Sequence, residues 1–111
     1  MSALDLIATA SDATFAGRVM MSMFTTAQNV AAEDPTTVNH AARVNYSQRI
    51  FRGEEQPQLV AAHVIASNAT ISAAIQATPA DKGSNVPDSD IQFALSTIWD
   101  ARSLAFANIT T

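Results

Sequence analysis

Two histidines, His40 and His63, are the side chains in this sequence best suited to acid–base or metal chemistry. They fall on different predicted helices, and no H-x-x-x-H or H-E-x-x-H spacing places a second ligand beside either one. His63 lies in an uncharged helical stretch, which favours a hydrogen-bonded core residue or an interface donor. His40 lies near a helix start, and we expect it to face solvent. A catalytic or metal pair would therefore depend on a tertiary contact.

The remaining chemical motifs are absent or explained by helix structure. Asp88 and Asp90 lie two residues apart at a predicted helix start, where they act as capping residues, and the glycine and glutamate of an EF-hand loop are missing. Three scattered glycines, Gly17, Gly53 and Gly83, match neither a Walker nor a Rossmann loop. No serine lies in a nucleophile elbow, and the absence of cysteine excludes disulfides and thiolate sites. We therefore expect no enzyme activity, no metal and no cofactor.

One cluster of basic residues, on a single predicted helix, could contact nucleic acid. It consists of Arg43, Arg49 and Arg52. The alternative is that these arginines pair with Glu33, Glu54, Glu55 or the acids of a neighbouring subunit. The net charge of −4 favours pairing, because a general nucleic-acid binder needs a basic face.

The composition indicates one folded domain, residues 1–111, with an unusually neutral surface. Hydrophobic residues make up 48 % of the chain and charged residues only 14 %, and Lys82 is the sole lysine. A domain this small exposes much of its surface, so that surface must be rich in alanine and small polar residues. Such a surface is common where one subunit packs against copies of itself. No basic signal peptide opens the chain and no stretch is apolar enough to predict a membrane span.

Apolar residues recur at three- and four-residue spacing, which predicts an all-α fold. We expect a single bundle of four to five helices, with a short N-terminal helix and one loop around residues 78–87. The expected helices cover residues 3–10, 13–32, 35–52, 57–76 and 88–107. The third begins with Asp34 as cap and Pro35 in the first turn, Gly53 ends it, and Asp88 caps the last.

Each long helix has a predicted buried stripe. These stripes are Phe15, Val19, Met23, Ala27 and Val30; Val38, Ala42, Tyr46 and Ile50; Val60, Val64, Ile71 and Ile75; and Ile91, Leu95 and Ile98, followed by Arg102, with Trp99 and Phe106 on the adjacent stripe. Met20, Met21 and Met23 are expected to fill the core, with an adaptable contact surface as the alternative. The helix expected over 57–76 is uncharged on all sides, which indicates burial on more than one side or a subunit interface.

Three segments carry a family resemblance: "SDATFAGRV", "RVNYSQRIFRG" and "VPDSDIQFALSTIWDA". As a set they resemble small all-helical structural proteins of tailed bacteriophages, the nearest class being the head–tail connector or neck adaptor. The resemblance implies a non-enzymatic virion protein, made in the host cytoplasm, that forms a homo-oligomeric ring between portal and tail. DNA would pass through the lumen of that ring without specific binding, and no membrane is involved.

Interface residues follow from this hypothesis. They are Leu4, Ile7, Arg49, Arg52, Lys82 and Asn85. The alternative function is a small helical adaptor or regulator that binds one protein partner, and a third is an enzyme that uses His40 or His63.

Overall fold

Five helices and no strand occupy residues 13–77 and 85–110, which are the residues that this computed structural model describes. The helices are α2 (Ala13–Ala32), α3 (His40–Phe51), α4 (Pro57–Ser67), α5 (Ala69–Ala77) and α6 (Asp88–Thr110). The expected all-α fold is confirmed. The helix expected over 3–10 and most of the loop at 78–87 lie outside the described residues.

Helix α2 forms as its amphipathic pattern predicts. All five residues of its expected stripe are buried, from Phe15 at one end to Val30 at the other. The methionines divide between the two interpretations: Met23 is buried, whereas Met20 is 38 % and Met21 is 67 % exposed. Only one of the three therefore fills the core.

Helix α3 begins five residues later than expected, at His40. The carboxylate of Asp34 accepts hydrogen bonds from the backbone N–H and the hydroxyl of Thr36, both at 2.9 Å, so it stabilises a turn rather than a helix start. Asn39 then adopts a left-handed conformation with φ 62°, which no helix can continue through. Val38 therefore lies before the helix, and its predicted burial is wrong, because the residue is 77 % exposed.

The predicted helix over 57–76 is divided in two at Asn68. Its backbone is extended there, and its Oδ1 accepts a hydrogen bond from the N–H of Ile71 at 3.1 Å, which is the geometry of a helix N-cap. The axis bends by 106° between α4 and α5. Val60, Val64, Ile71 and Ile75 are nevertheless all buried, because each half keeps its own apolar face toward the core.

The prediction that no segment spans a membrane can be compared with the described helices. Among the described residues, no single helix has both the length and the apolar character to cross a bilayer, although α4 and α5 taken together would match by length and composition.

Helix α6 runs three residues beyond its expected end, to Thr110, and Asp88 is its first residue rather than its cap. The carbonyl of Pro87 accepts the first helical hydrogen bonds, from the N–H groups of Asp90 and Ile91. The Asp88 carboxylate instead accepts a 2.6 Å hydrogen bond from Arg18 on α2. Arg18 also donates to the carbonyl of Val86, so this arginine attaches the start of α6 to α2.

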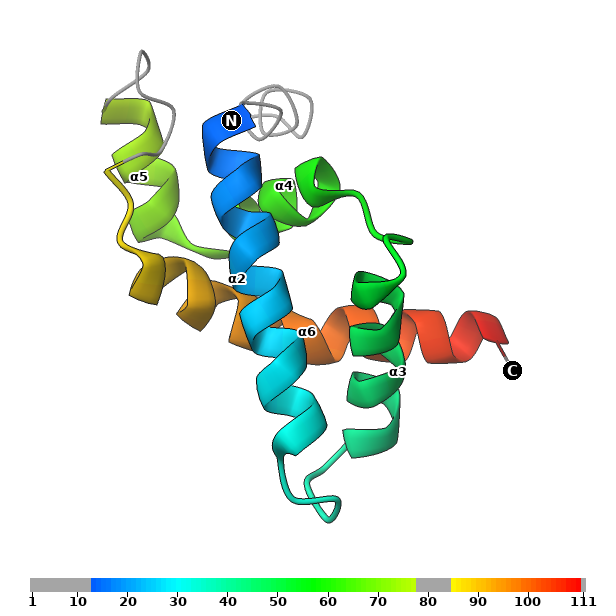
Figure 1. The fold of residues 1–111 in the computed structure, drawn as a ribbon. Helices are drawn as coiled ribbons and strands as arrows, with labels where there is room; N and C mark the ends of the chain where they lie inside the picture. The colour runs from blue at the N-terminus through cyan, green and yellow to red at the C-terminus, as the bar shows by residue number, and fades with distance from the viewer. Residues whose placement is uncertain (1–12, 78–84, 111) are drawn as a thin grey trace.

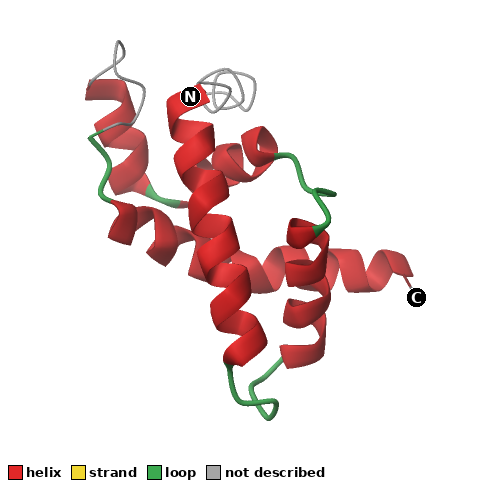
Figure 2. Cartoon of the chain, in the orientation of Figure 1, coloured by secondary structure: helices red, strands yellow, loops and turns green. Residues whose placement is uncertain are grey.

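The helices surround one core. Helices α2 and α3 lie antiparallel and side by side, and α6 crosses behind both and projects beyond α3 at its C-terminal end (Figure 1). Short loops join α2 to α3 and α3 to α4 (Figure 2). The largest fully buried side chains are Trp99, Tyr46, Phe15, Met23, Ile65, Ile71, Ile91 and Leu95. Helix α6 packs against α2, α3 and α4, and it contributes Trp99, Ile91 and Leu95 to this core.

Candidate functional site

The most buried polar cluster joins α3, the α3–α4 loop and α6. We call Tyr46, Glu55 and Arg102 the Glu55 cluster. The Glu55 side chain is only 4 % exposed, and its Oε2 accepts hydrogen bonds from Tyr46 Oη at 3.0 Å and from Arg102 Nη2 at 2.5 Å. Arg102 Nε also donates to Tyr46 Oη at 2.9 Å. Each of the three side chains is thus bonded to both of the others.

Local structure places Glu55 in this cluster. Helix α3 ends in a Schellman turn: Gly53 N–H donates to the carbonyl of Ile50, and Glu54 N–H donates to that of Arg49. Gly53 has φ 71°, which a residue with a side chain rarely adopts, so its predicted position after the helix is confirmed. The turn reverses the chain and directs Glu55 back toward α6.

Aromatic rings enclose the cluster. Trp99 packs edge-on against Tyr46 with ring centroids 4.8 Å apart, and Phe106 stacks on Tyr46 with ring centroids 5.8 Å apart. The Arg49 guanidinium lies 3.9 Å above the centre of Phe106. Burial raises the pKa of the Tyr46 phenol well above its ordinary value of 10. A protonated phenol and a carboxylate already bonded to an arginine supply neither a nucleophile nor a base, so this geometry suits anchoring rather than catalysis.

An apolar groove lies beside this cluster, between α4 and α6. Its volume is about 490 Å³. It is lined by His63, Ala66, Ser67, Ile98, Ala101, Arg102, Ala105 and Phe106. Of the two predicted roles of His63, burial in the core is wrong, because the residue is exposed at the edge of this groove, and its role as an interface donor stays a prediction. Partial burial of the ring lowers the pKa of His63, with the nearby Arg102 charge adding to the effect.

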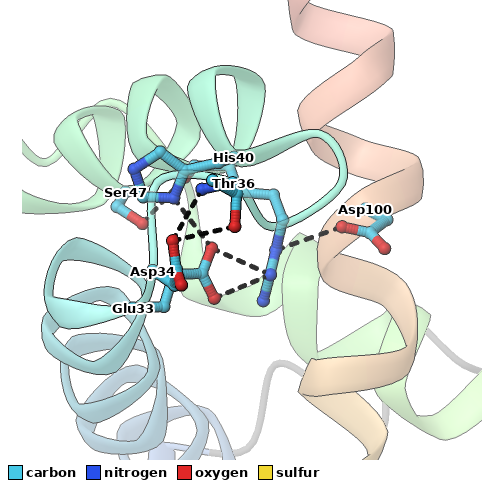
Figure 3. A network of polar contacts seen from close by, with 7 residues as sticks. Glu33, Asp34, Thr36, His40, Ser47 and Asp100 are labelled. Carbon is cyan, nitrogen blue, oxygen red and sulfur yellow. Dashed lines mark hydrogen bonds and ion pairs between the residues drawn. The ribbon is translucent and has the colours of Figure 1, made fainter.

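A second polar network joins the end of α2 to α3 and α6 (Figure 3). Arg43 donates to both carboxylate oxygens of Glu33, at 3.0 and 2.8 Å, and its Nε lies 3.1 Å from Oδ1 of Asp100. The ring Nδ1 of His40 is 3.1 Å from Glu33 Oε1. His40 is therefore half-buried against a carboxylate, and the expectation that it faces solvent is wrong.

The predicted interface residues have different surroundings. Arg49 lies 3.8 Å from both Glu54 and Glu55, and Arg52 lies 3.1 Å from Glu54. With Arg43 on Glu33, the three arginines make the intramolecular pairs that the alternative interpretation expected. Asn85 is exposed in the loop before α6. Leu4, Ile7 and Lys82 lie outside the described residues.

The other chemical expectations concern histidine and carboxylate clusters. His40 contacts Glu33, whereas His63 lines the α4–α6 groove, so the contacts do not pair the two histidines. Within the described ranges, no three histidine, aspartate or glutamate side chains are grouped so that they could hold a metal ion.

Several large apolar side chains are exposed in the described part of the chain. They are Val38 at 77 %, Phe93 at 70 %, Met21 at 67 %, Phe51 at 50 %, Leu59 and Leu104 at 42 %, and Met20 at 38 %. Small apolar residues of α4 and α5 are also exposed, at Ala66, Ala69 and Ala73. Single exposed apolar residues are ordinary, but several aromatic and methionine side chains on so small a domain are typical of contact surfaces.

Comparison with known proteins identified no relative. No family model, no curated protein and no solved structure matches the chain.

Proposed function

We propose that this chain is a non-enzymatic structural protein of a tailed bacteriophage, a head–tail connector that forms a ring between portal and tail. The proposal follows from the resemblance of its three sequence segments to that class. The observation that carries it is the exposure of large apolar side chains on a chain with 14 % charged residues. Such surfaces are stable in solution when copies of the subunit cover them.

The charge distribution supports a lumen through which DNA passes without binding. All five arginines lie within 4.0 Å of a carboxylate of the same chain, and the net charge is −4. Non-specific binding to DNA depends on cations that neutralise phosphates. Internal pairing and a negative total charge both weaken that attraction, so DNA could slide past such a subunit.

The test is the assembly state of the full-length chain. Light scattering coupled to size-exclusion chromatography, measured over a range of concentrations, should show a species of roughly ten or more subunits. Electron microscopy of that species should show a closed ring with an open centre. A chain that remains monomeric at every concentration and does not bind a purified portal ring would refute the proposal.

One observation favours the alternative of a small adaptor that binds a single protein partner. The α4–α6 groove is apolar, and an amphipathic helix of a partner protein could place side chains in it. This function predicts a monomer or dimer that forms a complex of fixed, small stoichiometry. A ring of the isolated chain would exclude it as the main role.

A further inference from the structure

We propose that neighbouring copies of this chain meet head-to-tail, with Phe93 of one copy inserted into the α4–α6 groove of the next. This inference rests on the proposed function, because it names the two surfaces through which subunits of the ring would contact each other.

The first surface is centred on Phe93. Its ring is 70 % exposed on α6, and Asp90 and Asp100 lie on the same helical face, three residues before and seven after it. Ser89, Ser96 and Thr97 complete this face. Phe93 is thus a large aromatic side chain among small polar and acidic ones, which is the arrangement of an anchor residue surrounded by a polar rim.

The second surface is the groove between α4 and α6. The groove has room because several of its lining residues have small side chains, namely Ala66, Ala101 and Ala105. Ile98 and Phe106 provide apolar contacts for an aromatic ring. A cavity of about 150 Å³ is sufficient for a benzene molecule. The groove, at about 490 Å³, therefore has room for a phenylalanine ring together with neighbouring side chains.

The net charges of the residues around the two surfaces have opposite signs, negative near Phe93 and positive at the groove. The residues near Phe93 and on its face of α6 carry three carboxylates and one arginine. They are Glu33, Asp90 and Asp100 with Arg43. The residues around the groove, from the C-terminal end of α3 to α6, carry three arginines and two glutamates. They are Arg49, Arg52 and Arg102 with Glu54 and Glu55. Complementary charge of this kind orients one copy on the next.

The positions of the two surfaces require a head-to-tail contact. Arg102, at the groove, is nine positions after Phe93, which is about two and a half helical turns, or roughly 14 Å along α6. The two surfaces therefore lie on opposite sides of the same helix. A copy that uses one surface leaves the other free for a third copy, so the contact can repeat and close into a ring, whereas a reciprocal contact would stop at a dimer.

The absence of cysteine allows a direct cross-linking test. The full-length double variant Ser96→Cys/Ala105→Cys keeps Phe93, places one cysteine a helical turn after it, and should form a ladder of disulfide-linked oligomers on mild oxidation. The matched control is Val38→Cys/Ala105→Cys, which also has one cysteine at a highly exposed position and should form far fewer cross-links. Ser96→Cys alone should form few covalent dimers, and predominant dimers of that variant would indicate a symmetric contact and overturn the proposal.

A second variant measures the contribution of the ring. Phe93→Ser changes an exposed side chain and should leave the fold intact, while raising the concentration needed for assembly about 30-fold or more, as expected for an interface anchor. Val38→Ser should have little effect. If the unmodified chain forms rings and Phe93→Ser forms them equally well, this contact is wrong while the connector function stands.

Two further outcomes would overturn the contact. If the unmodified chain assembles neither alone nor on a portal ring, both proposals fail. A disulfide within one chain in the variant Leu4→Cys/Ala105→Cys would show that the first residues of the chain occupy the groove themselves.

Discussion

Replacing Glu55 with alanine is expected to destabilise the fold by about 3 kcal/mol. The carboxylate is 4 % exposed and accepts hydrogen bonds from Tyr46 and Arg102, so its removal leaves a buried phenol and a largely buried guanidinium without their acceptor. Removing one partner of a buried ion pair costs about 3–5 kcal/mol. The lower end applies here because the Arg102 side chain is 19 % exposed and can regain part of its hydration.

This loss is large compared with the total stability of about 5–15 kcal/mol that is usual for a domain. At about 4 °C per kcal/mol for a chain of this length, the midpoint of thermal unfolding should fall by about 12 °C. Far-ultraviolet circular dichroism can follow the helices, and the fluorescence of the single tryptophan, Trp99, can follow the core beside the Glu55 cluster. Both signals should show the same shifted transition.

Two variants separate this explanation from a general effect of removing a charge. Glu54→Ala removes a neighbouring carboxylate that is 43 % exposed and pairs with Arg49 and Arg52, and it should cost below about 1 kcal/mol. The double variant Glu55→Met/Arg102→Met removes both charges and should be more stable than Glu55→Ala. If Glu55→Ala is no more destabilising than Glu54→Ala, the assignment of the Glu55 cluster as an anchor is refuted.

Three other predictions follow from single residues. Asn68→Ala should lower the free energy of unfolding by about 1 kcal/mol in urea titrations, because it removes the cap of α5; an unchanged midpoint would contradict that role. The lowered pKa of His63 means that the unfolded chain gains a proton first as the pH falls below 6.5. Stability should therefore decline on acidification through the folded pKa, and the stability of His63→Gln should decline less. Equal pH profiles would count against the partial desolvation of this ring and the effect of the nearby Arg102 charge. The raised pKa of Tyr46, the only tyrosine, should keep its phenol protonated above pH 10, and the ultraviolet absorbance of phenolate should therefore be absent there while the chain is folded. The free energy of unfolding should fall as the pH rises further, because the phenol ionises more readily in the unfolded chain. A phenol that titrates at its ordinary pKa while the helices persist would rule this out.

The helices with a continuous apolar period could be predicted from the sequence. Helix α2 and its buried stripe match the prediction from Phe15 to Val30, because a 3.6-residue period over 20 residues leaves one apolar face to bury. Gly53 was predicted at the end of α3 because a positive φ favours glycine. The errors lie where a polar side chain bonds to the backbone. Asp34 was assigned as a helix cap but stabilises a turn, and Asn68 caps a second helix inside a stretch whose hydrophobic pattern is uninterrupted.

The candidate site could be predicted only in part. The pairing of the α3 arginines with nearby glutamates was an open alternative, since Arg52 and Glu54 are close in the chain. No sequence signal pointed to the Glu55 cluster, because Arg102 lies 47 residues from Glu55 and 56 from Tyr46. Arg102 follows the apolar stripe of its helix, and that placement was the one available hint of a half-buried charge.

By itself the sequence determined the helical class, most of the buried stripes, the low content of charged residues and the negative net charge, since these depend on residue type and on spacing within a few turns. The tertiary structure decided which charges are buried together, where α4 bends into α5, and that Phe93 and the α4–α6 groove lie on opposite sides of α6. These features depend on how helices far apart in the chain cross. That crossing is set by the packing of the whole core, which no local pattern encodes.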